Sequence, residues 1–313
     1  MRERFPLDLT GQISIPDTWN AVHGGLADVY LGVMGDKKVA VKRLRIRKIN
    51  KNEDWEESNE RRLRREMHVW AALKHPNISE FLGYMTSPDE YPAMISIWYQ
   101  RGTVPEYLDS EKLPVSERLE LAQEICNGVQ YLHNLKIIHG DLKPVRGSSY
   151  GSSYSFLHRV ISLLNDTGAA RLCDFGLVRL ADWEGPAGMT TTSSYTGTER
   201  YKAPELFVSP ENRRPVATFE GDIYSLGCVM LEVIERIYPF GRFTKMGELQ
   251  HAIIGGYPPA QRKEANNALL DMTEYMWNLL EACWGEPFDR PKVDVIVDAL
   301  ETFQGAIEAS HEG

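Results

Sequence analysis

Alternation of apolar with small or polar residues marks the first hundred residues and predicts short strands. Residues 27–33 alternate in this way, residues 34–37 have the composition of a turn, and Val39–Lys42 return as a second strand, so the stretch predicts a hairpin. Two more short strands are expected at residues 78–86 and 93–98. The N-terminal part of the chain is therefore expected to be rich in strands.

Helical spacing appears first in residues 53–73. Their apolar residues Leu63, Met67, Trp70 and Leu73 follow one another at spacings of four, three and three, which places them on one face of a helix. Pro76 ends that helix, because proline restricts the residue before it.

Later segments repeat the helical pattern, and their expected bounds are 117–134, 221–235, 269–283 and 292–307. A strand-rich first part followed by a helix-rich second part predicts the α+β class, arranged as two lobes.

Composition and charge narrow the class of protein. The chain has 313 residues, of which 42% are hydrophobic and 25% charged, as in ordinary globular proteins. Its formal net charge of -9 argues against nucleic acid as a partner. The basic clusters Lys42–Lys51 and Arg61–Arg65 are interpreted as solvated surface in preference to a binding patch.

The cysteine content and the hydropathy of the chain indicate the cellular compartment of the protein. The four cysteines lack the close spacing of a metal site, so we expect buried free thiols in a reducing compartment. No run of 18 apolar residues predicts a membrane span, and the opening Met-Arg-Glu-Arg does not resemble a signal peptide. These features favour the cytoplasm, with the nucleus as an alternative.

Four short motifs follow one another in a set order: VAVK at Val39–Lys42, HGDLKP at His139–Pro144, DFG at Asp174–Gly176 and APE at Ala203–Glu205. Their order and spacing resemble the signature set of eukaryotic protein kinases. The resemblance covers about residues 19–305.

The resemblance implies a bilobal protein kinase-like fold with a strand-rich N-lobe and a helical C-lobe. It divides the chain into segments with the bounds 1–18 (arm), 19–101 (N-lobe), 102–305 (C-lobe, with an atypical insertion at 146–160) and 306–313 (tail). It further implies ATP and Mg²⁺ as cofactors, and transfer of the γ-phosphoryl group to the hydroxyl of a protein substrate.

Five residues take catalytic roles by this resemblance. Lys42 would bind the α- and β-phosphates, and Glu66 would be its ion-pair partner, although Glu66 could also be an ordinary surface carboxylate. Asp141 would accept the proton of the substrate hydroxyl, and Lys143 would neutralise the γ-phosphate. Asp174 would bind Mg²⁺, with a simple turn aspartate as the alternative.

The ATP-binding set is less complete. The glycine-rich loop of the family is reduced to Gly24, with Gly25 beside it, because both outer glycines are replaced. Val29 and Ala40 would pack on the adenine ring, or could equally form plain hairpin core.

The hinge between the lobes is assigned by resemblance to the stretch around Ile97. The Ile97 C=O and the Tyr99 N–H would bind adenine, with Ser96 at the back of the pocket. Leu163 completes the ATP-binding set.

Structural roles follow from the same resemblance. Thr198 would bond the catalytic loop, and Asp222 would anchor the backbone of that loop. Glu205 and Arg290 would form a buried ion pair. Lys143 and Thr198 resemble Ser/Thr kinases. The string CWGEPFDRP resembles the tyrosine-kinase-like group, and the strings GTERYKAPEL and DIYSLGCVMLEV resemble the kinases of that group abundant in fungi.

The first of two departures from the family pattern concerns regulation. Gly140 replaces the arginine that binds an activation-loop phosphate in relatives, so switching of activity by that phosphate is not expected. The hydroxyl-rich stretch 190–196 is compatible with phosphorylation and equally with a plain solvated loop.

The catalytic loop also lacks its metal-binding asparagine. Counting forward from Asp141 puts Arg146 at that position, and counting backward from the DFG motif puts Ile161 there. A guanidinium only donates hydrogen bonds and cannot bind Mg²⁺. Asn165 could substitute, but its Asn-Asp-Thr-Gly context favours a turn.

The irregular segment RGSSYGSSYSFLHRV at residues 146–160 accounts for the 15 residues between the two registers. We hypothesise that it is a translated unspliced intron, which the sequence of the transcript would test. The chain is then a protein Ser/Thr kinase with impaired activity, or alternatively a pseudokinase that serves as a binding or scaffold module. A dinucleotide-binding oxidoreductase is disfavoured because the glycines lie in a hairpin and not at a strand-to-helix turn.

Overall fold

The computed structural model describes residues 6–17, 21–23, 27–44, 53–87, 92–144, 162–165, 167–175, 179–180, 198–208, 216–262 and 270–311. These residues form two compact units. The first, called the sheet unit, takes its described residues from Met1–Tyr107 and Val145–Val178. The second, called the helical unit, takes them from Leu108–Pro144, Arg179–Gly185 and Ser193–Gly313.

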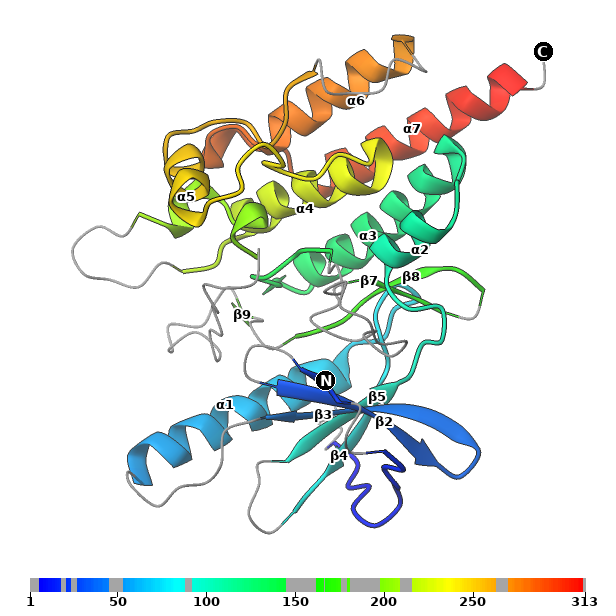
Figure 1. Ribbon diagram of the computed structural model, residues 1–313, viewed down its shortest axis with the longest axis vertical. Helices are drawn as coiled ribbons and strands as arrows, with labels where there is room; N and C mark the ends of the chain where they lie inside the picture. The colour runs from blue at the N-terminus through cyan, green and yellow to red at the C-terminus, as the bar shows by residue number, and fades with distance from the viewer. Residues whose placement is uncertain are drawn as a thin grey trace. The chain divides into compact units, whose positions relative to one another are not determined.

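A five-stranded antiparallel sheet with the order β1-β2-β3-β5-β4 forms the sheet unit (Figure 1). Its strands are β1 (Val22–His23), β2 (Ala27–Met34), β3 (Lys37–Leu44), β4 (Phe81–Met85) and β5 (Ala93–Ile97). The predicted hairpin is confirmed, with Met34 paired to Lys37 and Gly35 taking a positive φ of 59° in the turn.

Helix α1 (Glu53–Ala72) follows β3, and a small hairpin of β7 (Ser162–Leu164) and β8 (Ala170–Leu172) completes the described part of the sheet unit. Trp70 near the end of α1 is buried, and its ring centroid lies 5.0 Å from that of Phe81. The indole Nε1 of Trp70 donates a hydrogen bond of 2.7 Å to the Ser79 carbonyl. The C-terminal end of α1 is thereby packed against the sheet.

Helices dominate the helical unit, where α3 packs against α4 and α7, and α4 packs against α6 (Figure 1). Their bounds are α2 (Val104–Ser110, which crosses the sequence boundary of the two units), α3 (Val115–Asn134), α4 (Phe219–Glu235), α5 (Met246–Ile254), α6 (Leu270–Cys283) and α7 (Val293–His311). Short elements are β6 (Ile137–Ile138) paired with β9 (Arg179–Leu180), and the 3₁₀ turns η1 (Thr198–Tyr201), η2 (Pro204–Leu206) and η6 (Pro287–Asp289). Helix α4 is buried along nearly its whole length and forms the centre of this core.

The predicted α+β class is confirmed, and the predicted helices agree with α1, α3, α4, α6 and α7 to within a few residues. Two short helices, α2 and α5, were not predicted. Helix α7 continues to His311, so residues 306–311 are helical although the sequence assigned them to a tail.

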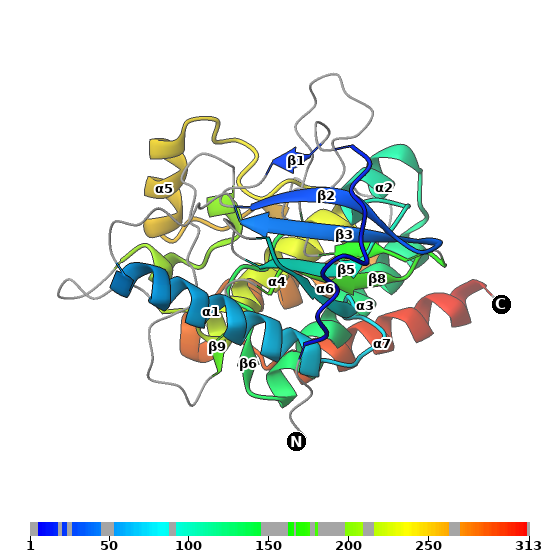
Figure 2. The same cartoon turned by 90° about the horizontal axis from the view of Figure 1, so that it is seen from below.

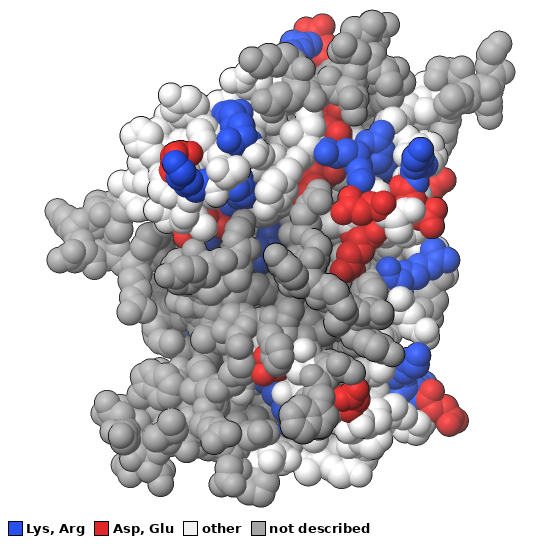
Figure 3. All heavy atoms as spheres, viewed as in Figure 1, with Lys and Arg blue, Asp and Glu red and all other residues white. Residues whose placement is uncertain are grey.

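The described surface carries charges of both signs. On the face drawn in Figure 3, Lys and Arg side chains are interspersed with Asp and Glu among the coloured residues. In the cluster Arg61–Arg65, Arg64 pairs with Glu60 on the exposed side of α1, as expected for a solvated helix face. None of the helices within the described ranges combines the length and the apolarity needed to cross a bilayer.

All four cysteines are free and buried, as the sequence predicted. Burial raises the pKa of the Cys283 thiol to about 12 and that of Cys228 well above its ordinary value. These thiols are therefore protonated, apolar parts of the core.

Candidate active site

Three charged side chains meet in the sheet unit: Lys42 of β3, Glu66 of α1 and Asp174 after β8. The Lys42 Nζ lies 2.5 Å from Asp174 Oδ1 and 3.6 Å from Glu66 Oε1. The side chain of Lys42 is 20% exposed, that of Asp174 is 26% exposed and that of Glu66 is 11% exposed, so the cluster is largely shielded from water. The structure thus brings together residues that lie up to 132 positions apart in the sequence.

Burial and charge act against each other in this cluster. Burial alone would lower the pKa of Lys42, but the carboxylates of Asp174 and Glu66 outweigh it, and the pKa lies above its ordinary value. Burial raises the pKa of Glu66, Lys42 opposes the shift, and the charge of Asp174 adds to it. Lys42 is therefore a firmly held cation beside an excess of negative charge.

The backbone at Asp174 is held in an uncommon conformation. Its φ is +66°, a left-handed value that aspartate tolerates better than most residues. The next residue, Phe175, is fully buried, and its ring centroid lies 5.3 Å from that of Trp70. Packing of Phe175 on α1 and the bond to Lys42 together stabilise this conformation.

The segment His75–Ser79 joins the end of α1 to β8. The Leu172 N–H donates to the Asn77 carbonyl over 2.8 Å, and the Ser79 N–H donates to the Leu172 carbonyl over 2.7 Å. The buried Asn77 side chain donates from Nδ2 to the Ala170 carbonyl over 3.0 Å. The sequence predicted the end of a helix at His75–Asn77 and a strand from residue 78, whereas the stretch also fixes the strand that precedes Asp174.

The residues predicted to surround adenine lie in the sheet unit. Tyr99 and Cys173 are buried together, and Val29, Ile97 and Trp98 pack against them. Ala40 is 6% exposed and lies opposite Ser96 in the β3–β5 ladder. The sequence placed Trp98 in the hinge stretch without a contact to adenine, and Cys173 was not included.

Gly24 and Gly25 lie outside the described residues. Leu163 lies in β7 opposite Arg171, and only its backbone is described.

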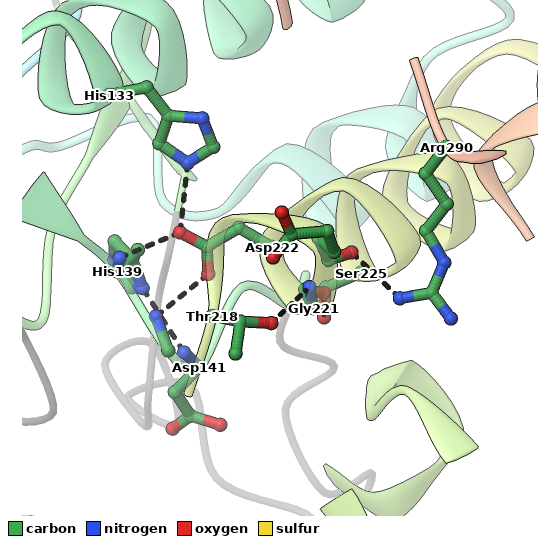
Figure 4. Close-up of polar contacts among 10 residues, drawn as sticks. His133, His139, Asp141, Thr218, Gly221, Asp222, Ser225 and Arg290 are labelled. Carbon is green, nitrogen blue, oxygen red and sulfur yellow. Dashed lines mark hydrogen bonds and ion pairs between the residues drawn. The ribbon is translucent and has the colours of Figure 1, made fainter. Parts of the chain in front are cut away.

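In the helical unit, Asp222 holds the backbone of the predicted catalytic loop (Figure 4). Its Oδ2 accepts from the His139 N–H over 2.7 Å, and its Oδ1 accepts from the Gly140 N–H over 2.8 Å. The His133 Nε2 lies 3.0 Å from Oδ2. Asp222 is only 2% exposed and lies in the first turn of α4, where Thr218 caps the helix by accepting from the Gly221 N–H.

Asp141 follows this anchored pair in the chain. Its carboxylate forms an ion pair with Lys143, which is buried, while its backbone N–H donates to His139 Nδ1 over 3.4 Å. A small hollow in the helical unit is lined by the loop around Asp141, by Tyr201 and Lys202, and by the start of α4. Asp141 is therefore one wall of a concave surface.

Gly140 has a φ of +78° and lies between His139 and Asp141. A side chain at this φ costs about 1 kcal/mol, so Gly140→Ala is expected to lower the free energy of unfolding by roughly that amount. Gly247→Ala is the control, because Gly247 lies in α5 without a positive φ and nothing lies within 4 Å of an added Cβ. Urea denaturation of both variants tests this, and an equal effect of the two substitutions would contradict it.

Glu205 and Arg290 form a bidentate ion pair, with Nη1–Oε1 at 2.6 Å and Nη2–Oε2 at 3.0 Å. Arg290 also donates to the carbonyls of Glu220 and Gly285, each over 2.9 Å. Its side chain is 2% exposed, and its guanidinium lies 5.2 Å from the ring centroid of Tyr224. The arginine thus joins η2, the start of α4 and the segment before α7.

Three residues of η1 bind this turn to α4, to α5 and to the segment between them. None of the three was selected from the sequence. Glu199 accepts from Gln250 of α5 over 2.8 Å, and the Tyr201 hydroxyl donates to Glu232 of α4 over 2.5 Å. Arg200 donates to the Phe240 and Phe243 carbonyls over 2.5 and 2.6 Å. The side chain of Thr198, the residue that was selected, lies outside what the structure describes.

The two positions that should hold asparagine, Arg146 and Ile161, also fall outside the described residues. Asn165 does lie within them, and it forms a turn. Its Oδ1 accepts from the Thr167 and Ala169 N–H groups over 3.0 and 2.8 Å. This geometry agrees with the turn that the sequence favoured over a metal ligand.

Comparison with known proteins decides the family. The family model described as "Protein kinase domain" matches residues 23–299, which is most of the chain. The chain belongs to the protein kinase family. The predicted protein kinase fold, with a sheet-rich N-lobe and a helical C-lobe, is thereby confirmed, and with it the class of transferase.

Relatives of this kinase share low identity with it. It is 27% identical to "Dual specificity protein kinase shkC" of Dictyostelium discoideum, covering 89% of this chain and 49% of that protein. It is 26% identical to "Serine/threonine/tyrosine-protein kinase HT1" of Arabidopsis thaliana, covering 98% of this chain and 70% of that protein. It is 29% identical to "Serine/threonine-protein kinase mos" of Patiria pectinifera, covering 89% of this chain and 72% of that protein. The chain spans about half of the first of these proteins.

Protein kinases use ATP and Mg²⁺, and the described residues fit part of this requirement. Lys42 could supply a shielded cation for phosphate, and Asp174 could supply a hard oxygen ligand for the metal ion. Glu66 Oε1 is buried and lies 3.6 Å from the Lys42 Nζ, so the two groups form an ion pair that is shielded from water. The second oxygen ligand, the asparagine, is missing from the sequence at both registers.

Proposed function

We propose that the chain is a protein Ser/Thr kinase of the tyrosine-kinase-like group whose phosphoryl transfer is impaired by the interrupted catalytic loop. The observation that carries the proposal is the cluster of Lys42, Glu66 and Asp174. A lysine with a raised pKa between two carboxylates is suited to binding a polyphosphate and its metal ion.

Each residue then has a defined task. Bound Mg²⁺ and ATP supply the phosphoryl group and the counter-charge for its transfer. Lys42 binds phosphate oxygens, and Glu66 holds the Lys42 ammonium through their ion pair. Asp174 binds the metal ion through its carboxylate. Asp141 orients the substrate hydroxyl and receives its proton.

Asp222 supports this chemistry indirectly. By accepting from two consecutive N–H groups it fixes the backbone immediately before Asp141. The ion pair of Asp141 with Lys143 holds the position of the carboxylate that would accept the proton.

A pseudokinase that acts as a binding module is the second candidate. It is favoured by one observation, the absence of asparagine at residue 146 or 161. Loss of one metal ligand weakens the hold on Mg²⁺, while Lys42 and the adenine-side cluster are still present for nucleotide binding.

Finer assignments rest on motif resemblance and on charge. The strings GTERYKAPEL and CWGEPFDRP support the tyrosine-kinase-like group, and Lys143 supports Ser/Thr acceptors over Tyr. Protein hydroxyls are the proposed substrates, and the net charge of -9 speaks against nucleic acid. Four free, buried cysteines support a reducing location, the cytoplasm or the nucleus.

Nucleotide binding tests the proposal directly. We expect Mg²⁺·ATP to raise the thermal midpoint of the parent chain, and Lys42→Met to weaken the affinity about tenfold or more, since a charged hydrogen bond to phosphate is lost. Lys37→Met is the matched control, because Lys37 lies exposed on the same strand. A parent chain that is not stabilised by nucleotide would contradict the proposed function.

A further inference from the structure

Residues 6–17, called the N-terminal strap, precede the matched family domain and yet belong to the sheet unit. The Leu9 N–H donates to the Tyr84 carbonyl over 2.7 Å, and the Tyr84 N–H donates to the Leu7 carbonyl over 2.9 Å. Ser14 and Val33 exchange both backbone hydrogen bonds, at 3.0 and 2.8 Å. The strap is therefore bonded to β4 at one edge of the sheet and to β2 near the other.

Between these two attachments the strap crosses β3 and β5, as Figure 2 shows for the dark blue segment. Leu9 is 2% exposed and shares a cluster with Val39 and Val41 of β3 and Ala93 and Ile95 of β5. Ile13 and Ile15 of the strap pack against the same cluster. The strap thus covers one apolar face of the sheet.

Two glycines provide the space for this crossing. A Cβ added to Gly83 would lie 2.2 Å from the Leu7 carbonyl oxygen, and Gly83 has a φ of +155°. A Cβ added to Gly32 would lie 3.0 Å from the Ile13 side chain and 2.8 Å from that of Val41. Gly83 and Gly32 therefore leave room for the strap at its attachments to β4 and β2.

Side-chain hydrogen bonds also attach the strap to the chain just after β4, at the edge of the sheet. The Thr10 hydroxyl donates to Asp8 over 2.6 Å and accepts from the Thr86 N–H over 3.0 Å. These groups are exposed, so they can be changed without opening the core.

The covered face is the back of the strand that carries Lys42. Side chains alternate along a strand, so Val39 and Val41 point to the strap while Ala40 and Lys42 point to the opposite face. Both valines are fully buried. Release of the strap would expose these valines and loosen β3 directly behind Lys42.

We propose that the N-terminal strap is a positioning element for nucleotide binding, which holds β3 and with it Lys42 in place. The expected effect of the strap on nucleotide affinity rests on the proposed function, whereas its effect on the stability of β3 does not. Leu9 is the central positioning residue, because it contacts β3 and β5 at once.

The test is region-specific hydrogen exchange combined with nucleotide affinity, on the full chain. We expect Leu9→Ala to speed exchange of the β3 amides at least tenfold and to weaken Mg²⁺·ATP binding about threefold or more. Thr10→Val, which removes only the exposed fastening, should shift both quantities in the same direction by less. The matched control is Leu119→Ala, a buried leucine of α3, which should leave both quantities at parent values.

The outcomes separate the two proposals. Equal acceleration in β3 and α3 on Leu9→Ala, or no change in β3, would overturn the strap proposal. Faster β3 exchange with unchanged affinity would overturn the link to Lys42. Faster β3 exchange in a chain that binds no nucleotide would support the strap as a support of β3 and would count against the proposed function alone.

Discussion

Deleting residues 146–160 and replacing Ile161 with asparagine is expected to raise Mg²⁺·ATP-dependent phosphoryl transfer roughly 100-fold over the parent chain. The deletion restores the spacing between the HGDLKP motif and the strand that becomes β7, and the substitution restores the oxygen ligand. One well-placed group that stabilises transition-state charge is typically worth about 100-fold or more in rate.

Two matched variants make this result specific. The deletion alone should recover little transfer, because isoleucine offers no oxygen to Mg²⁺. Ile161→Asp with the deletion should recover part of it and change the dependence on metal concentration. Autophosphorylation and transfer to a generic protein substrate are the measurements, with phosphoamino-acid analysis to separate Ser/Thr from Tyr acceptors.

Robust turnover by the unaltered 313-residue chain would contradict this expectation and would show that the loop works without its asparagine. A repaired chain that binds nucleotide but transfers no phosphoryl group would favour the binding-module function. A transcript that encodes residues 146–160 would contradict the intron hypothesis.

Arg290→Met is expected to lower the free energy of unfolding by about 3–5 kcal/mol, the usual loss when a buried ion pair loses one partner. Arg290 gives four hydrogen bonds to Glu205, Glu220 and Gly285, and its side chain is 2% exposed. Methionine fills similar space but leaves the Glu205 carboxylate and two carbonyls without their donor.

Urea denaturation checks this value. Arg262→Met is the control, because Arg262 and Glu274 form an exposed pair that should contribute less than about 1 kcal/mol. Adding Glu205→Gln to Arg290→Met should recover part of the loss, since the uncompensated charge is then removed. A loss below about 1 kcal/mol for Arg290→Met would show that the pair is not a main stabiliser of the helical unit.

Long periodic segments were predictable because periodicity is a local property. The hairpin of β2 and β3 and the five longer helices all carry their apolar spacing within the segment itself. The short helices α2 and α5 give too few turns for such a pattern. A local signal for α2 was present, since Thr103 and Glu106 exchange the two hydrogen bonds of a capping box.

The site residues were found through motifs, and their contacts could not have been derived from spacing. Nothing in the sequence separation of 132 residues between Lys42 and Asp174 predicts an ion pair of 2.5 Å. The fastening of η1 by Glu199, Arg200 and Tyr201 likewise depends on tertiary packing against α4 and α5. The sequence assigned the N-terminal strap to an arm, because the partners of Leu9, Ile13 and Ile15 on β3 and β5 lie far along the chain and cannot be derived from local spacing.

The hydrogen bonds between the segment His75–Ser79 and β8 make α1 a lever with one fixed end. Glu66 lies six residues before Ala72, the last residue of α1, and a helix rises about 1.5 Å per residue, so the lever arm is about 9 Å. A tilt of about 10° around the fixed end would therefore move Glu66 by about 1.6 Å. A tilt away from β3 would lengthen the 3.6 Å separation of Lys42 and Glu66, whereas Asp174 is held through β8 and Phe175 near the fixed end of α1. A tilt of α1 would therefore change the Lys42–Glu66 contact more than the Lys42–Asp174 contact.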